Sequence, residues 1–201
     1  MIFNFSDNYQ FTTRLSLKDT NIEVVEKMKI LGTIINNRLT WDENCNAIIT
    51  KVNSRMQLLR ELQRFGSSTH EMVHFWILFC RSILEQSCVV WGGSLTQENI
   101  ESLERTQKTF SKMVLKQRYK NYENALLFLN LDTLEQRRKE FFKRFAKNEI
   151  LKNTLNDLLP LNNKKHNMKT RKNEKYVVNF ANTNRLKNAS VISMQKILND
   201  E

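Results

Sequence analysis

Glycine and proline are scarce in this sequence, which has only 4 glycines and 1 proline among 201 residues. A chain of many tight turns needs more of both, because glycine reaches positive φ without steric cost and proline pre-sets turn geometry. The scarcity favours a fold dominated by helices. A hydrophobic fraction of 40% is enough for a real core in about one domain.

Long hydrophobic runs are also missing. The longest, residues 75–80, is far too short to span a bilayer, and residues 1–10 have neither the basic nor the apolar region of a signal peptide. The three cysteines, Cys45, Cys80 and Cys88, are odd in number and not at metal-binding spacing. We therefore expect reduced, buried thiols in an intracellular protein of the nucleus or cytoplasm, with no membrane partner.

Acidic residues are too few to balance the basic ones: 21 Asp and Glu face 32 Lys and Arg, giving a formal charge of +11. Such an excess favours an anionic partner, and nucleic acid is the first choice. A basic surface that is merely solvated is the alternative. A membrane surface ranks third, because no basic amphipathic helix stands apart from the core pattern.

A catalytic constellation is absent from the sequence. The aspartates are scattered and form no Asp-Asp pair on a hairpin, as two-metal phosphoryl transfer requires. No glycine-rich phosphate loop and no G-x-S-x-G motif occur. We expect no catalytic residue, metal, cofactor or small-molecule substrate for this chain.

Residues 70–74 match H-E-x-x-H, the helical zinc-protease motif. Glu71, however, follows Ser68 by three residues and is explained as a helix capping box. The longer form of the motif needs glycine where Ile77 stands and a third histidine where Cys80 stands. We expect a capping glutamate and two helix-face histidines instead of a zinc site.

The first segment, residues 1–41, is predicted to form a short antiparallel β-sheet of three or four strands. Alternation or apolar runs mark residues 1–5, 11–17, 22–25 and 28–35, with turn signals between them. Gly32 interrupts the last run, which suggests a bulge or a close approach of another part of the chain.

The rest of the chain is predicted to be helical. Residues 42–118 should form a three-helix bundle, with helices at about 43–65 (capped by Asp42), 69–91 (ended by Gly92 and Gly93) and 97–117 (capped by Thr96). Residues 119–160 should add helices at 123–129 and 134–150 that pack on the bundle. Residues 161–201 read as a basic, partly flexible tail with a weak helix near 191–198.

The third helix of this bundle has two contrasting faces. Stepping about 100° per residue places an apolar stripe on one side and a basic stripe on the other. The apolar stripe consists of Ile100, Leu103, Phe110, Met113 and Val114, and the basic stripe of Arg105, Lys108, Lys112 and Lys116. The basic stripe is either a solvated face or a surface for phosphate groups, and the sequence leaves both readings open.

Three stretches taken together resemble a known family. They are MKILGTIINNRLTWDENC (28–45), RSILEQSCVVWGGSLTQENIESLERTQKTFSKMV (81–114) and LNLDTLEQRR (129–138). Their order resembles the C-terminal part of reverse transcriptases of jockey-like, non-LTR (LINE-type) retrotransposons, over roughly residues 1–150. No single stretch is specific; the order as a whole is.

The resemblance implies a fold and a partner. Residues 1–35 would be the end of the palm sheet, with Leu31 and Gly32 in the primer-grip region, and the helical bundle would be the thumb. The catalytic Asp-Asp pair, which uses Mg²⁺ in the full-length enzymes, would lie upstream and is not in this sequence. We therefore expect no autonomous polymerase activity, an RNA/DNA primer–template duplex as partner, and contact with a separate palm or full-length reverse transcriptase.

A thumb binds the sugar-phosphate backbone without reading sequence, so it needs Lys and Arg at helical spacing. The first-choice nucleic-acid contacts are Lys51, Arg55, Arg105, Lys108, Lys112 and Lys116, and the second-choice contacts are Arg137, Arg138, Lys143 and Lys147. Two other hypotheses stay open: a helical protein-interaction module that uses the apolar helix at residues 75–91, and a retroelement remnant without function of its own.

Overall fold

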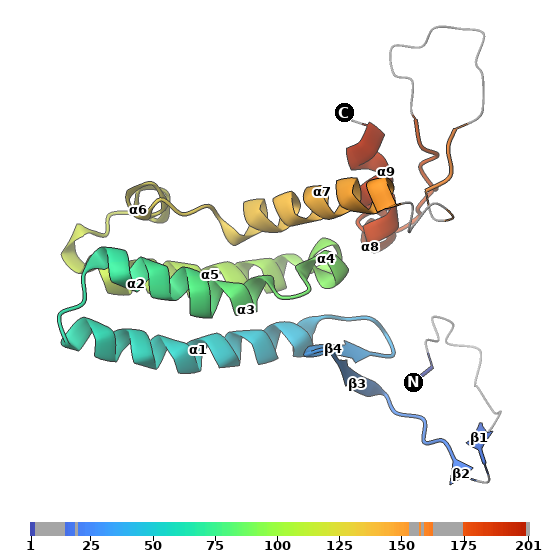
Figure 1. Cartoon of the computed structure of the whole chain (residues 1–201), viewed down its shortest axis with the longest axis horizontal. Coiled ribbons are helices and arrows are strands. Elements are labelled where there is room, and N and C mark those ends of the chain that lie inside the picture. The colour runs from blue at the N-terminus through green and yellow to red at the C-terminus, as the bar shows by residue number, and fades with distance from the viewer. Residues whose placement is uncertain (3–14, 19, 153–156, 158, 163–174, 200–201) are drawn as a thin grey trace, which may run out of the picture.

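The computed structural model describes residues 1–2, 15–18, 20–152, 157, 159–162 and 175–199. This part of the chain is mainly helical, with short antiparallel strands near its N-terminus. Figure 1 shows α1 along one side of a layer formed by α2, α3, α4 and α5, while α6 and α7 lie on the other side. The predicted flexible stretch of the tail lies largely outside the described residues.

The strands form two separate hairpins instead of the single sheet predicted. Strand β1 (Ser16–Leu17) pairs with β2 (Thr20–Asn21), and β3 (Lys27–Ile30) pairs with β4 (Thr33–Asn36), both antiparallel. Two-stranded pairs bury little on their own, and β3 is exposed along its whole length. The strand predicted at 1–5, and most of that at 11–17, lies outside the described residues.

The prediction of a single strand at residues 28–35 is wrong, because this stretch forms two strands joined by a turn. Leu31 and Gly32 both have positive φ, 47° and 89°, as in the two-residue turns that join antiparallel strands. Gly32 is therefore a turn residue and not a bulge. The predicted close approach is confirmed: a Cβ on Gly32 would lie 2.8 Å from Nε2 of Gln86, which donates a hydrogen bond to the Leu31 carbonyl at 3.1 Å.

Helix α1 (Asp42–Arg64) buries the apolar face that its periodicity predicts. The predicted cap was wrong: Trp41 precedes the first turn and no side chain caps it. Asp42 instead accepts a hydrogen bond from Nδ2 of Asn99 at 2.8 Å. Near the other end, Nε2 of Gln63 donates to the Met113 carbonyl at 2.9 Å, so α1 is tied at both ends to α5.

The second predicted helix is interrupted. It consists of α2 (Thr69–Phe75), a π-helix (Trp76–Arg81), α3 (Ser82–Glu85) and α4 (Cys88–Trp91). The capping box of Ser68 and Glu71 is confirmed. The chain breaks at Gln86 and Ser87, where Ser87 has φ 54°, because the Gln86 carbonyl turns to accept a hydrogen bond from Nε1 of Trp91 at 3.0 Å.

The remaining helices of the bundle follow the prediction closely. They are α5 (Gln97–Leu115) with its predicted Thr96 cap, a 3₁₀ turn (Lys116–Arg118), α6 (Tyr122–Leu129) and α7 (Leu134–Lys152). The core lies where α1, α2, the π-helix and α5 meet. There the Trp76 and Phe110 rings stack with their centroids 4.4 Å apart, and both side chains are fully buried.

The C-terminal segment packs against the bundle through α8 (Asn184–Lys187) and α9 (Ser190–Asn199). Figure 1 shows both beside the C-terminal half of α7. A second core joins them: Phe142 and Ala146 of α7 pack with Leu159, Tyr176 and Met194. A Cβ on Gly93 would lie 2.5 Å from the Asn188 carbonyl oxygen, so the approach of this segment requires glycine there.

Candidate nucleic-acid interface

An acid-free basic surface covers the outer side of α5 and the turn that follows. Between Glu104 and Glu123 the sequence has basic residues and no acidic one. All the basic side chains are exposed: Arg105, Lys108, Lys112, Lys116, Arg118 and Lys120. We call these six residues the α5 basic surface. The sequence analysis found the first four and missed Arg118 and Lys120, which lie beyond the helical period used to find the others.

Glu104 does not neutralise this surface, because its carboxylate is turned inward. It accepts hydrogen bonds from the Tyr122 hydroxyl and from the Leu134 amide, with N–O distances of 3.1 and 3.3 Å. The second contact places a negative charge at the N-terminus of α7, where the helix dipole favours it. Burial, followed by the Glu104 contact, raises the pKa of Tyr122 well above its ordinary value.

A buried glutamine fixes α5 to its neighbours behind the basic surface. Gln107 is fully buried, and its Nε2 donates to the Tyr122 hydroxyl at 3.0 Å and to the Asp132 carbonyl at 2.8 Å. Its Oε1 accepts from Nε1 of Trp76 at 3.4 Å. These bonds join α5 to the π-helix, to α6 and to the loop before α7, so the exposed lysines stand on a rigid support.

Two tyrosines lie beside the lysines of the α5 basic surface. Nζ of Lys108 lies 5.1 Å from the centroid of the Tyr122 ring, and Nζ of Lys112 lies 5.5 Å from that of Tyr119. Each contact contributes about 0.5–1 kcal/mol at an exposed site. The contacts restrict the lysine side chains and leave their ammonium groups facing solvent.

Lys116 and Arg118 have a second, purely structural explanation. They follow the C-terminus of α5, where unpaired carbonyls and the negative end of the helix dipole attract cations. Lys116 ends the helix with φ 49° and ψ −118°, a conformation that favours glycine. Arg105 and Lys108 lie farther from this end, so the dipole explains their charge less well, whereas Lys112 belongs to the last turn of α5.

The structure does not bring Lys51 and Arg55 onto the α5 basic surface. Lys51 is exposed and Arg55 is half-buried, and Arg55 lies close enough to Cys80 of the π-helix to lower the thiol pKa against the larger effect of burial. The side of α1 that faces α5 instead forms a cleft of about 340 Å³ with Thr109. Its lining is Thr50, Asn53, Ser54, Met56, Gln57, Arg60 and Thr109. Arg60 is thus a basic residue of α1 that lies beside this part of α5.

Arg137 belongs to an ion-pair cluster between helices. Its guanidinium binds the Glu85 carboxylate through Nε and through Nη2, the latter at 3.2 Å. Nε of Arg81 lies 3.6 Å from the same carboxylate. The hydrogen bond to Glu85 raises the pKa of Arg137. This cluster joins α3 to α7, and the Glu85 carboxylate already occupies the guanidinium that a phosphate would need.

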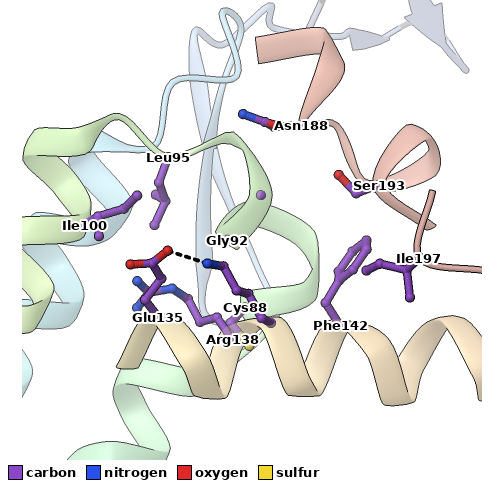
Figure 2. A pocket seen from close by; sticks show the side chains of 12 residues that line it. Cys88, Gly92, Leu95, Ile100, Glu135, Arg138, Phe142, Asn188, Ser193 and Ile197 are labelled. Atoms are coloured by element: carbon purple, nitrogen blue, oxygen red, sulfur yellow. Dashed lines mark ion pairs between the residues drawn. The ribbon is translucent and has the colours of Figure 1, made fainter. Parts of the chain in front are cut away.

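Arg138 is buried, with only 6% of its surface exposed. It lines a pocket of about 300 Å³ between α7 and the C-terminal segment, where Figure 2 shows its guanidinium on the side of Ile100, away from Phe142 and Ile197. Neither Nη atom has a hydrogen-bond partner among the described residues. Burial lowers the pKa of Arg138, and nearby Glu104 partly opposes that effect. A solvent-side phosphate cannot reach this guanidinium in the observed conformation.

The other sequence-predicted residues lie apart from the α5 basic surface. Lys143 and Lys147 are exposed on the C-terminal half of α7, and both have interactions within the chain. Leu31 is at the tip of the β3–β4 hairpin and is 90% exposed, while Gly32 faces Gln86.

Metal and thiol chemistry find no support in the geometry. His70 and His74 lie side by side, with ring centroids 4.1 Å apart, but Glu71 is bound to Ser68. Among the residues that the structure describes, no group of His, Cys, Asp or Glu could hold a metal ion. The three cysteines are free and buried, as predicted, and burial raises the pKa of each thiol to about 11.

In the described part of the chain, no single helix is long and apolar enough to cross a membrane. Thr69–Glu85 and Cys88–Ser94, bent by 44° at the break between them, reach that length and composition only together. No protein-family model, curated protein or solved structure matches the chain.

Proposed function

We propose that this protein binds the sugar-phosphate backbone of nucleic acid through the α5 basic surface, without reading sequence. The supporting observation is the run of six exposed basic residues with no acidic residue among them. Lysine and arginine that neutralise phosphates release counterions, which makes binding strong, salt-dependent and independent of sequence. The carboxylate of Glu104, which directly precedes Arg105, is turned inward.

We further propose, from the sequence resemblance, that the chain is the thumb and C-terminal portion of an RNA-directed DNA polymerase of a non-LTR retrotransposon. Its ligand would be the RNA/DNA primer–template duplex, and it would act inside the cell, in the nucleus or cytoplasm. A rigid bundle with a cationic outer face suits a part that grips a duplex while a separate palm performs the chemistry.

Exposed apolar side chains favour a second candidate, a helical protein-interaction module. Leu78 and Phe79 of the π-helix are 64% and 46% exposed, and Leu58 of α1 is 56% exposed. Leu17, Met28, Ile30 and Leu31 of the hairpins are exposed as well. A missing palm or a full-length reverse transcriptase would be the proposed partner for these surfaces. Light scattering that shows a monodisperse monomer, with no binding of a hydrophobic dye, would contradict this candidate.

Charge reversal on α5 tests the proposed function. We expect Lys108→Glu combined with Lys112→Glu to reduce the magnitude of the slope of log affinity against log salt by about 2 for an RNA–DNA hybrid, one unit per lost phosphate contact. Lys18→Glu combined with Lys29→Glu changes the net charge equally at exposed hairpin positions and serves as the control. Equal slopes for the two variants would refute the assignment of the site to α5.

A further inference from the structure

A basic hollow lies beside the middle of α7, where the C-terminal segment packs against the bundle. It measures about 430 Å³ and is lined by side chains from α7, α8 and α9 and from the turn between α8 and α9. Its described lining comprises Lys139, Glu140, Lys143, Lys187, Asn188, Ser193, Lys196 and Ile197. Four lysines from three helices thus face one hollow, and we call it the lysine hollow.

Two carboxylates, those of Glu135 and Glu140, are described next to these lysines, and Lys143 has an interaction of its own within the chain. Glu140 is the only acidic residue of the described lining, and its carboxylate is shared with Nη2 of Arg144 at 3.5 Å. Lys139 pairs with Glu135 at 2.7 Å, but both side chains are at least half exposed, and such surface pairs contribute only about 0–1 kcal/mol. An anion that binds more strongly can therefore displace Glu135 from Lys139.

The fold holds the lysines close together. Nζ of Lys196 donates to the Lys187 carbonyl at 3.2 Å, which joins α9 to the end of α8. Nearby, the Ser190 hydroxyl donates to the Val89 carbonyl at 3.1 Å, which ties the same segment to α4. Figure 2 shows Asn188, Ser193 and Ile197 on this segment, opposite α7, and these three residues line both the Arg138 pocket and the lysine hollow.

The lysine hollow is separate from the α5 basic surface. The two helices run in opposite directions from the contact between Glu104 and Leu134 (Figure 1). Lys112 is eight residues beyond Glu104, and Lys143 is nine residues beyond Leu134, so at 1.5 Å per residue the two sites lie about 25 Å apart along the bundle. No residue belongs to both.

We propose that the lysine hollow binds consecutive phosphates of a nucleic-acid backbone, as a second contact of the chain with its nucleic acid. Among the described residues, the lining contains lysines and no aromatic side chain, so this part of it offers charge to phosphates but no platform on which bases could stack. Duplex nucleic acid presents a charge about every 1.7 Å of helix axis when both strands are counted, whereas a fully extended peptide spans about 3.3–3.6 Å per residue. A duplex therefore offers these lysines a higher density of negative charge than an extended acidic peptide does. This inference rests on the proposed function.

Substitutions at the two lysines contributed by the C-terminal segment test the inference. We expect Lys187→Glu with Lys196→Glu to reduce the slope of log affinity against log salt by about 2, and the affinity at about 0.1 M salt on the order of 50-fold, for an RNA–DNA hybrid of about 20 base pairs. The neutral pair Lys187→Gln with Lys196→Gln should lose the same slope and less affinity, because it removes both positive charges without adding negative ones. Circular dichroism and urea unfolding establish that each variant is folded.

The control pair Lys18→Glu with Lys29→Glu separates a local effect from one of net charge. The binding site in the lysine hollow is refuted, and the proposed function stands, if the Glu and Gln variants of Lys187 and Lys196 have the same salt slope as this control while the Lys108→Glu, Lys112→Glu variant has a smaller one. If the unmodified protein does not bind the hybrid, both fail. Competition by oligoglutamate as effective as that by an oligonucleotide of equal charge would show a general polyanion surface and would also overturn the inference.

Discussion

The hydrogen bonds of Gln107 offer the clearest test of how the bundle holds α5 in place. Replacing Gln107 with leucine keeps the side-chain volume but removes two donated bonds and the acceptor for Nε1 of Trp76. A typical hydrogen bond contributes about 1 kcal/mol, and a buried group left without a partner costs about 1–3 kcal/mol. Trp76 is fully buried, so we expect Gln107→Leu to lower the free energy of unfolding by about 3 kcal/mol.

Urea unfolding followed by tryptophan fluorescence measures this change. With an m-value of about 2 kcal/mol/M, the midpoint should fall by about 1.5 M at unchanged m. The same substitution at exposed Gln117 is the control and should change stability by less than about 0.5 kcal/mol. A loss at Gln107 no larger than that at Gln117 would refute the view that this network supports α5.

Two further predictions concern groups buried in the bundle. Arg138→Met should leave nucleic-acid binding unchanged and stability unchanged or raised by about 1–2 kcal/mol, because it removes a buried charge without hydrogen-bond partners among the described residues; a stability loss above about 2 kcal/mol, or weaker binding to the hybrid, would contradict this. The three cysteines should react slowly with a thiol reagent at pH 8 in the folded protein and fast in urea, since burial raises each pKa from 9.0 to about 11. A thiol whose pKa is raised on folding stabilises the protein at pH values below the pKa of the unfolded chain, so the free energy of unfolding should fall as the pH rises from about 9 to about 11. Fast labelling of the folded protein at pH 8 would argue against buried thiols.

Local signals predicted most of the helical structure, because periodicity and capping depend on neighbouring residues. The capping box at Ser68 and the Thr96 cap are of this kind. The break at Gln86 and Ser87 could not be predicted this way. No glycine or proline marks it, and it depends on hydrogen bonds of Gln86 with Trp91 and with Leu31, which is distant in sequence.

The candidate site was predictable to a similar extent. The 100° step placed the α5 lysines correctly on the solvent side. The same step places Arg138 on the apolar face of α7, because it lies four residues after Leu134 and four before Phe142. The sequence analysis overlooked this signal. The lysine hollow has no signal in the sequence, because Lys187 and Lys196 reach α7 only through the packing of the C-terminal segment.

The measurement that tests the central claim most directly is fluorescence anisotropy of a labelled RNA–DNA hybrid with the unmodified protein, from about 50 mM to about 300 mM salt. Six phosphate contacts on the α5 basic surface would give a log–log slope near −5, at about −0.9 per contact. We predict a slope of at least about half that magnitude, equal for hybrids of unrelated sequence. A slope near zero, or no binding at the lowest salt by protein shown to be folded, would contradict the account and leave the α5 basic surface as solvated surface.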